Sequence, residues 1–152
     1  MKYGAGLKKY VQAGDQSCSP EKLQALAKSK VDRIRLRVAE NDHAPKEALE
    51  LLARDCNPDI RIAVGINPNT PPHIRFSLAA DEDVNVRFGL AEEITCPVEL
   101  LEKLCQDNNP YVSCRANQTR QLRFAEPRAS NFECKRLFRW VSDCDFPGFK
   151  YA

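Results

Sequence analysis

The stretch NPNTPPHIRFSLAADEDVNVR, residues 67–87, places a turn rich in proline and asparagine before a short apolar segment that ends in Val-Arg. Its Leu-Ala pair belongs to a column with a period of about 26 residues: Leu26-Ala27, Leu52-Ala53, Leu78-Ala79 and Leu104-Cys105. Two more apolar columns keep this spacing: Ile34, Ile60, Val86 and Val112, then Val38, Val64, Leu90 and Ala116. Three columns with one period indicate a repeat protein whose units bury their apolar faces by stacking.

Each repeat unit is predicted to contain two short helices. In the clearest unit these are PKEALELLARD, residues 45–55, and DIRIAVGIN, residues 59–67. We expect about ten residues in the first helix and roughly four to eight in the second, part of it 3₁₀, because so short an α-helix is marginal alone. A further column is predicted to lie just inside the start of each first helix: Ser19, Pro45, Pro71 and Pro97.

Charged residues accompany the apolar columns. Arg35, Arg61 and Arg87 directly follow one column, and six residues before them stand Ser29, Asp55 and Asp81. This spacing lets a carboxylate face a guanidinium in its own unit and another in the neighbouring unit. It therefore predicts an interior ladder of charge-assisted hydrogen bonds. The structural residues of this ladder are then Asp55, Arg61, Asp81 and Arg87. Because Ser29 carries no charge, we expect Arg35 to be freer than the other two arginines.

The NPNTP turn, the LAADEDVNVR block and the Val-Arg column resemble the leucine-rich repeat variant family, a relative of HEAT-like helical repeats. The resemblance covers residues 19–120 and is weaker where Ser29 replaces the acid and Ser113 the arginine. It implies an all-α, right-handed α-solenoid of about four repeats, with alternating α- and 3₁₀-helices and no β-sheet. Some members carry an iron–sulfur cluster in a cysteine-rich segment, but residues 1–17 contain no cysteine, so we expect no cofactor.

The chain is predicted to form a single structural domain with three segments. Residues 1–18 are an N-terminal segment or cap, residues 19–120 the four repeats, and residues 121–152 a C-terminal capping helix with an aromatic tail. Ser130 and Glu133 fit a capping box at the start of that last helix. Leu7, Tyr10 and Val11 are candidates to cover the first unit, and an uncovered apolar end would favour self-association.

Composition predicts a folded, cytoplasmic protein. The 152 residues are 43% hydrophobic and 29% charged, which is typical of globular chains. No apolar run approaches the roughly 20 residues of a membrane span, and the N-terminal stretch lacks the apolar core of a secretory signal. The seven cysteines include no CxxC pair, which favours reduced thiols over a disulfide framework or a zinc ribbon.

No catalytic or metal site is predicted, because the chain lacks a nucleophile elbow, a phosphate loop and a dinucleotide fingerprint. His43 and His73 lie in different units, so we expect both on the surface. Cys114 falls in the apolar column of Leu36, Ile62 and Phe88, which predicts a core position. A redox or iron–sulfur role that combines Cys134 and Cys144 with a cysteine of the fourth unit stays open as a less favoured alternative.

The run RIRLR, residues 33–37, is the most concentrated basic stretch. Arg33 and Arg37 are one helical turn apart and are expected to share an exposed face. Tyr111 and Arg115 occupy the same two columns in the fourth unit. Because tyrosine and arginine favour interface centres, we expect these four residues to bind a partner. The sequence therefore predicts a non-enzymatic scaffold for another macromolecule, first of all a protein.

The charge distribution leaves a second function open. Lys plus Arg outnumber Asp plus Glu by nine to five in residues 1–42 and by eight to four in residues 115–152, but are outnumbered by twelve to six in residues 43–114. Basic ends suit nucleic acid, whereas an acidic middle opposes a continuous basic stripe. Nucleic-acid binding through the basic terminal regions is therefore the alternative function, and it predicts a steep loss of affinity with salt.

Overall fold

The computed structural model describes residues 4–124, and this part of the chain is entirely helical. The all-α prediction is therefore confirmed for these residues, whereas the predicted capping helix, the aromatic tail, Cys134 and Cys144 lie outside them. The helices within this range are α1 (Ala5–Ala13), α2 (Pro20–Leu26), α3 (Asp32–Ala39), α4 (Lys46–Leu52), α5 (Pro58–Ile66), α6 (Pro72–Leu78), α7 (Val84–Glu92), α8 (Val98–Leu104) and α9 (Pro110–Phe124).

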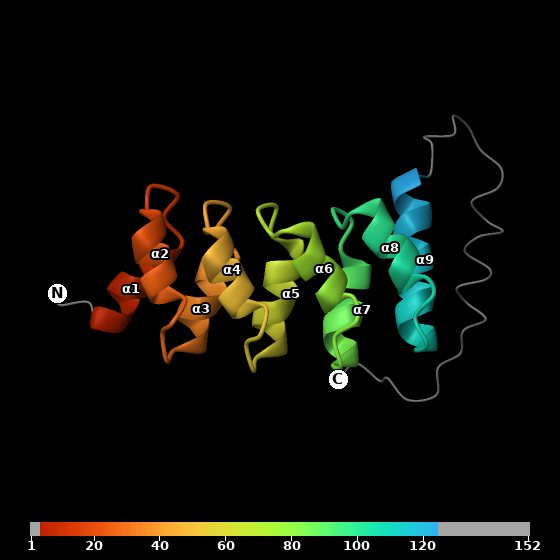
Figure 1. Cartoon of the computed structure of the whole chain (residues 1–152), viewed down its shortest axis with the longest axis horizontal. Coiled ribbons are helices and arrows are strands. Elements are labelled where there is room, and N and C mark those ends of the chain that lie inside the picture. Colours follow the sequence, from red (N-terminus) through yellow and green to blue (C-terminus); the bar gives the residue numbers. More distant parts are fainter. Residues whose placement is uncertain (1–3, 125–152) are drawn as a thin grey trace, which may run out of the picture.

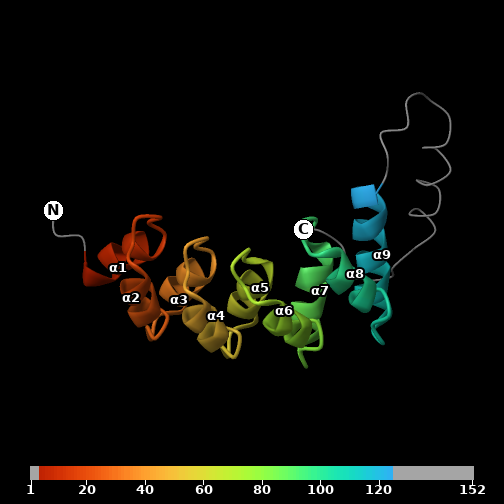
Figure 2. The ribbon, with the colours of Figure 1, turned by 45° about the horizontal axis from the view of Figure 1, so that its top comes forward.

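The helices follow one another in a row from α1 to α9 (Figure 1). The odd-numbered helices form one continuous layer, since α1 packs on α3, α3 on α5, α5 on α7 and α7 on α9. We call this the odd layer. The even-numbered helices α2, α4 and α6 lie along its side (Figure 2). Each helix of the row is thus held by helices nearby in the sequence.

The apolar columns of the sequence form the core, as predicted. Ile60, Val64 and Leu90 are fully buried in the odd layer, and Leu49 and Leu101 are fully buried on the even-numbered helices. Burying one such side chain contributes about 1.5–3 kcal/mol relative to leaving it exposed. Because no helix of seven to nine residues is stable alone, this shared burial is what holds the short helices in place.

The helix lengths differ from those predicted. The helices α2, α4, α6 and α8 span seven residues each, whereas α3, α5 and α7 span eight or nine. The predicted 3₁₀ contribution to the second helices is wrong, because these helices are α-helical over their whole ranges. The column of Ser19, Pro45, Pro71 and Pro97 supplies N-cap residues, one position earlier than predicted.

The last helix is longer than its counterparts. The fifteen residues of α9 run through the predicted boundary between residues 120 and 121. The nine-residue α5 ends at Ile66, and the next residues are Asn67 and Pro68, whereas α9 has Thr119 at the position of Asn67. No proline or glycine follows in the sequence until Pro127, so no helix-breaking residue ends α9 after two turns.

Three bidentate Arg–Asp pairs connect α3, α5 and α7 to the turn before the next odd-layer helix, and we call them the Arg–Asp ladder. The guanidinium Nε and Nη2 bond both carboxylate oxygens in each pair: Arg35–Asp55 at 2.6 and 3.0 Å, Arg61–Asp81 at 2.8 and 3.0 Å, and Arg87–Asp107 at 2.7 and 3.3 Å. Nη1 donates to a backbone carbonyl six residues earlier: Ser29, Asp55 and Asp81. Each arginine thus joins its own unit to the next.

This pattern corrects two expectations from the sequence. Within its own unit an arginine contacts the backbone carbonyl of the acidic residue and not its carboxylate. Arg35 is not freer than its counterparts, because it binds Asp55 and also lies 3.0 Å from a carboxylate oxygen of Asp32. Asp107 is a third ladder acceptor that was not predicted. Since each arginine pairs with the following unit, Ser29 and Ser113 stand where the ladder ends.

Each ladder aspartate also shapes the turn before the next helix. Oδ1 of Asp55 accepts the backbone N–H of Asn57 at 3.0 Å, and Asn57 in turn caps α5 by accepting the N–H of Asp59. Desolvation by burial alone would raise the pKa of Asp55. The hydrogen bonds from Arg35 and from the Asn57 N–H outweigh it, so the pKa lies below the ordinary 3.8. The carboxylate therefore stabilises the fold in its charged form.

Two buried asparagines form a second ladder, the amide ladder, which the sequence analysis missed. Nδ2 of Asn67 donates to the carbonyls of Ala39 at 2.7 Å and Asn41 at 2.9 Å. Nδ2 of Asn41 donates in the same way to Ala13 and Asp15. Both amide oxygens accept a backbone N–H two residues later. The available signal was asparagine at the same position of successive repeat units, directly after a second helix.

The amide ladder is interrupted at Glu93, whose side chain lacks the NH₂ group with which asparagine donates. The carbonyl of Asn67 instead accepts from Nη2 of Arg75 at 2.6 Å, and the same nitrogen lies 3.0 Å from the carbonyl of Pro68. Position 75 belongs to a column that is otherwise leucine and fully buried: Leu23, Leu49 and Leu101. Nε of Arg75 is buried without a hydrogen-bond partner in the described residues. Arg75 thus replaces the missing amide.

This exchange predicts strong coupling between positions 75 and 93. Arg75→Leu alone fills the leucine column but removes the Arg75 bond to the Asn67 carbonyl, which keeps only the N–H of Thr70, so we expect its stability within about 1 kcal/mol of wild type. Adding Glu93→Asn restores the amide donor, and the double variant should exceed wild type by about 1–2 kcal/mol. Urea unfolding of the four chains measures the coupling; strictly additive effects would contradict this explanation of Arg75.

Candidate functional site

Two adjoining cavities lie between consecutive helices of the odd layer. The first, of about 620 Å³, lies between α1 and α3, and the second, of about 470 Å³, lies between α3 and α5. Leu36 and Glu40 line both cavities. We therefore treat them as one surface, the groove. Concave, mainly apolar surfaces with a few polar groups are the usual form of a binding site.

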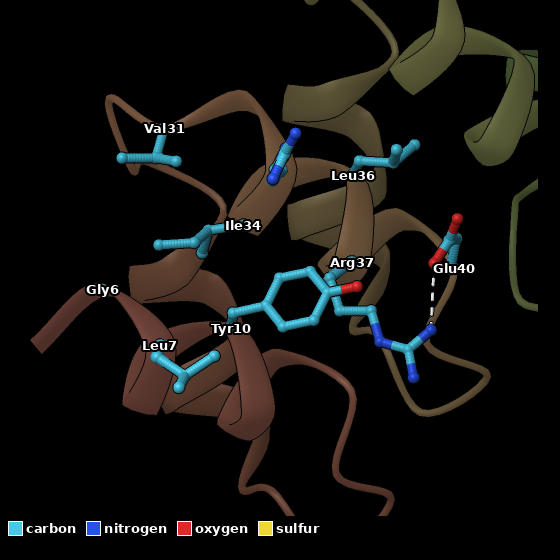
Figure 3. Close-up of a pocket in the computed structure, with 9 residues that line it drawn as sticks. Gly6, Leu7, Tyr10, Val31, Ile34, Leu36, Arg37 and Glu40 are labelled. Atoms are coloured by element: carbon cyan, nitrogen blue, oxygen red, sulfur yellow. Dashed lines mark hydrogen bonds and ion pairs between the residues drawn. The ribbon is translucent and has the colours of Figure 1, made fainter. Parts of the chain in front are cut away.

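The first cavity is built from α1 and α3 (Figure 3). Leu7 and Tyr10 of α1 line this cavity together with Ile34 of α3, and the Tyr10 ring extends toward Arg37 (Figure 3). Arg37 lies with its guanidinium carbon 5.9 Å from the centre of the Tyr10 ring, and its Nη1 lies 3.1 Å from a carboxylate oxygen of Glu40. The guanidinium also passes so close to Gly14 that a Cβ there would collide with it. These contacts fix Arg37 across the junction of α1 and α3.

The second cavity has an apolar floor and an acidic rim. Leu36, Ile62 and Ile66 form the floor, and the rim includes Asp42 and Asp59. The column of Leu36 and Ile62 was interpreted as core, as was Cys114. Leu36 and Ile62 are instead partly exposed at the groove, and Cys114 is exposed. Periodicity alone could not separate this column from the buried ones, because both are apolar and follow the same spacing.

Arg33 and Arg37 lie on the same face of α3, since both line the first cavity. Their surroundings differ. Arg33 is exposed and has no carboxylate within 4.0 Å among residues 4–124, whereas Arg37 is 43% exposed and is paired with Glu40. Of the two, Arg33 is therefore the cation that can meet a partner, and Arg37 mainly holds the groove together.

The other two predicted partner-binding residues lie elsewhere. Tyr111 and Arg115 belong to α9, toward the opposite end of the row from α3 (Figures 1 and 2). Tyr111 is exposed, and Arg115 lies 3.3 Å from Glu92 in an ion pair. The structure therefore does not bring the four residues into one site. Within the odd layer, equivalent positions in the first and fourth units are separated by α5 and α7.

The N-terminal helix covers the row differently from the expectation. α1 packs on α2 and α3, and Ala13 is its fully buried residue. Leu7, Tyr10 and Val11, the candidates to cover the first unit, remain 40–62% exposed, so they cover it only in part. Leu7 and Tyr10 line the groove instead. Their exposure makes this end of the row the more apolar surface of the candidate site.

Other chemistry is not assembled within residues 4–124. This part of the chain contains no cluster of three His, Cys, Asp or Glu residues that could hold a metal ion, and none of its helices is long and apolar enough to cross a membrane. His43 and His73 are exposed, as predicted. Burial raises the pKa of the Cys96 thiol to about 11, which keeps it protonated and unreactive at neutral pH.

Comparison of the chain with protein-family models, curated proteins and solved structures finds no match. The chemistry of the groove is therefore the basis for a proposed function. Its properties are an apolar floor at Leu36 and Ile62, an exposed cation at Arg33, and carboxylates at Asp42 and Asp59.

Proposed function

We propose that this chain is a non-enzymatic helical-repeat scaffold that binds a segment of another protein in the groove. The observation that carries the proposal is the partly exposed apolar column of Leu36 and Ile62, which forms the floor shared by consecutive odd-layer helices. Burying an apolar side chain of a partner there would contribute about 25 cal/mol for each Å² removed from water.

The fold that we propose for this scaffold is a right-handed α-solenoid like that of the leucine-rich repeat variant family. The Arg–Asp ladder supports it, because the same donor atoms meet the same acceptor atoms three times, once at each step from one repeat unit to the next. The consecutive packing of the odd layer supports it as well. In such a solenoid both ladders preorganise the groove, so a partner can bind without the entropic cost of ordering a loop.

The charge of the groove favours a protein over nucleic acid. A surface that follows a phosphate backbone is basic along its length. The groove has Arg33 in its first cavity, but Asp42 and Asp59 line the second. Carboxylates at that position would repel phosphates, whereas a protein segment can carry charges of both signs. Nucleic-acid binding through the basic terminal regions therefore remains the second proposal.

Affinity capture from the native host's lysate, with two single-residue variants of the chain, tests whether a partner binds in the groove. Ile62→Glu places a charge on the floor, and Leu51→Glu makes the same kind of change at an exposed leucine of α4, outside the groove. We expect Ile62→Glu to retain at least ten-fold less of the captured protein, whereas Leu51→Glu behaves like wild type. Thermal unfolding of both variants checks that each is folded.

The capture is done with and without nuclease, and the outcomes separate the proposals. A protein that survives nuclease and is lost with Ile62→Glu supports the groove; capture of the chain itself would make that partner a second copy. Partners that bind the Ile62→Glu variant and wild type equally tightly would exclude the groove as the binding site. Material that disappears on nuclease treatment, with affinity that falls steeply with salt, would move the function to the basic ends.

A further inference from the structure

A third cavity, of about 460 Å³, lies at the junction where the amide ladder is interrupted. It is bounded by the end of α5, by α6 and α7, and by the turns that follow α5 and α7. Gly65, Ile66, Leu90 and Pro97 give it a mainly apolar wall, and Arg75 brings a charge to it. Binding sites for small ligands combine this size with an apolar wall and a few polar groups.

The turns at this junction are not bridged in the way that those of the preceding junction are. There, the amides of Asn67 and Asn69 both donate across the junction, to carbonyls within residues 39–42. Glu93 and Thr95 stand at the corresponding positions one repeat period later. Oε1 of Glu93 accepts the backbone N–H and the hydroxyl of Thr95, at 3.1 and 2.8 Å, so these two residues bond with each other. The space between the turns is left to the cavity and to Arg75.

The guanidinium of Arg75 keeps unused donors. Its Nη2 donates to the carbonyls of Asn67 and Pro68, and its Nε is buried without a partner in the described residues. Its Nη1 makes no hydrogen bond within residues 4–124 and is not buried, so a ligand can reach it. No carboxylate of this part of the chain lies within 4.0 Å of the guanidinium. Unpartnered buried donors are rare in folded proteins, and a cation without a counter-ion at a cavity wall suits an anionic ligand.

Arg123 adds a second positive charge beside the third cavity. Its Nη1 donates to the carbonyl of Cys96, which lines the cavity. Burial raises the pKa of the Cys96 thiol to about 11, and the charges of Arg75 and Arg123 oppose that rise. Both cations therefore act on this end of the cavity. The carboxylate of Glu93 acts in the opposite direction, so two positive charges face one negative charge and the site keeps an unbalanced positive charge.

We infer that the third cavity binds a carboxylate carried on an apolar group, with the carboxylate on Nη1 of Arg75 and the apolar part against Ile66 and Pro97. The third cavity shares Ile66 and Pro68 with the second cavity, but Ile62 of the groove floor does not line it. This inference goes beyond the proposed function and does not depend on it.

The shortage of donors favours a carboxylate over a phosphate. The N–H and the hydroxyl of Thr95 are already bonded to Glu93, and Pro68 and Pro97 have no N–H. Nη1 of Arg75 is thus the main donor that the lining residues offer. A phosphate group carries about two charges and three strong acceptor oxygens, most of which would lose water without gaining a bond. A carboxylate needs fewer donors, and its single charge matches the unbalanced charge of the site.

An NMR titration of the full chain with phenylbutyrate tests the site, and phenylbutyramide, which lacks the charge, is the matched ligand. We expect phenylbutyrate to shift the backbone amide signals of Gly65 and Thr95 and to bind about ten-fold or more tightly than the amide. Arg75→Leu should weaken phenylbutyrate binding by about the same factor. Arg54→Leu, at an exposed arginine that does not line the cavity, and Ile62→Glu in the groove should bind like wild type.

A short peptide that ends in phenylalanine, with a free or an amidated C-terminus, separates the two sources of such a carboxylate. Binding of the free acid that depends on Arg75 would support the inference and assign the ligand to a protein C-terminus. Binding of phenylbutyrate without binding of the peptide would support it and assign the ligand to a small molecule.

Equal binding of phenylbutyrate to wild type and Arg75→Leu, equal binding of the acid and the amide, or no binding to wild type would overturn the inference. Loss of binding with Ile62→Glu but not with Arg75→Leu would place the probe in the groove and overturn it as well. If Arg75→Leu does not fold, Arg75→Gln, which keeps a donor for the Asn67 carbonyl without the charge, gives the same comparison.

Discussion

Replacing Asp55 with alanine is expected to lower the free energy of unfolding by about 3 kcal/mol at pH 7. Asp55 and Arg35 are the most buried ladder pair, with side chains 7% and 12% exposed. The substitution removes two charge-assisted hydrogen bonds to Arg35 and the bond from the Asn57 N–H that shapes the turn before α5. It also leaves the Arg35 guanidinium poorly solvated, with Asp32 as its remaining carboxylate.

The loss should depend on pH in a defined direction. The pKa of Asp55 is below 3.8 in the folded chain, so its contribution is fully present above pH 3.8 and is lost as the pH falls through the folded value. The difference between wild type and Asp55→Ala should therefore shrink from pH 6 to pH 2.5. Urea unfolding at a series of pH values measures it, with exposed Asp59→Ala as the control. A difference that is independent of pH would contradict a role for the ladder charge.

Replacing Asn67 with alanine should cost about 2–4 kcal/mol of unfolding free energy, because three hydrogen bonds of a buried amide are lost. The side chain donates to the carbonyls of Ala39 and Asn41 and accepts from the N–H of Asn69, in a site that is only 3% exposed. The carbonyl of Ala39 would lose its Asn67 donor at the junction of α3 and α5, whereas the carbonyl of Asn41 would keep only the N–H of Ala44. Asn67→Asp should cost still more, because a carboxylate faces the two carbonyl oxygens.

The neighbouring Asn69 supplies a matched control. It lies in the same turn and is exposed, and its amide donates one hydrogen bond, to the carbonyl of Asp42. Asn69→Ala should therefore cost less than about 1 kcal/mol. Urea unfolding followed by far-UV circular dichroism compares the two alanine variants. Equal losses at positions 67 and 69 would show that the amide ladder contributes little to the junction of successive helices.

The sequence predicts the helical fold and its core well, because burial follows periodicity. The columns of Ile60 and Val64 recur once in every repeat unit, and these positions are buried in each unit. The lengths of the helices are less predictable. Helix propensity does not include the stabilisation that tertiary packing gives to a nine-residue helix such as α5. The absence of a helix-breaking residue after Thr119, which would have predicted the longer α9, is visible in the sequence.

The polar ladders are only partly predictable. The spacing of Arg61 and Asp55 marks both as ladder residues, but which acid an arginine meets depends on how consecutive units stack. That stacking pairs Arg61 with Asp81, twenty residues later, and makes Asp107 the last acceptor. Arg75 is equally hard to predict. An arginine in a column of leucines is explained only by the fold, in which it supplies the donor that Glu93 lacks in the amide ladder.

The candidate site is the least predictable feature. The charge of Arg33 and the variable column that it belongs to predict a partner-binding residue, and Arg33 lies at the groove. Arg115 was chosen by the same reasoning but lies on α9, away from α3, because equivalent residues of different units are displaced along the row. The floor residues Leu36 and Ile62 share an apolar column with no difference in spacing from core columns. Their exposure depends on how helices of different units pack in the odd layer, and the sequence of one unit does not predict that packing.

Site-specific photo-cross-linking tests the central claim, that a protein partner binds on the groove floor. A photoreactive residue at position 62 lies on the floor, and one at position 51 lies at an exposed site of α4 as the control. After irradiation in the native host's lysate, position 62 should give a discrete cross-linked protein that position 51 does not give, and unlabelled wild-type chain should compete for it. Equal cross-linking from both positions, or a product from position 51 alone, would contradict the claim.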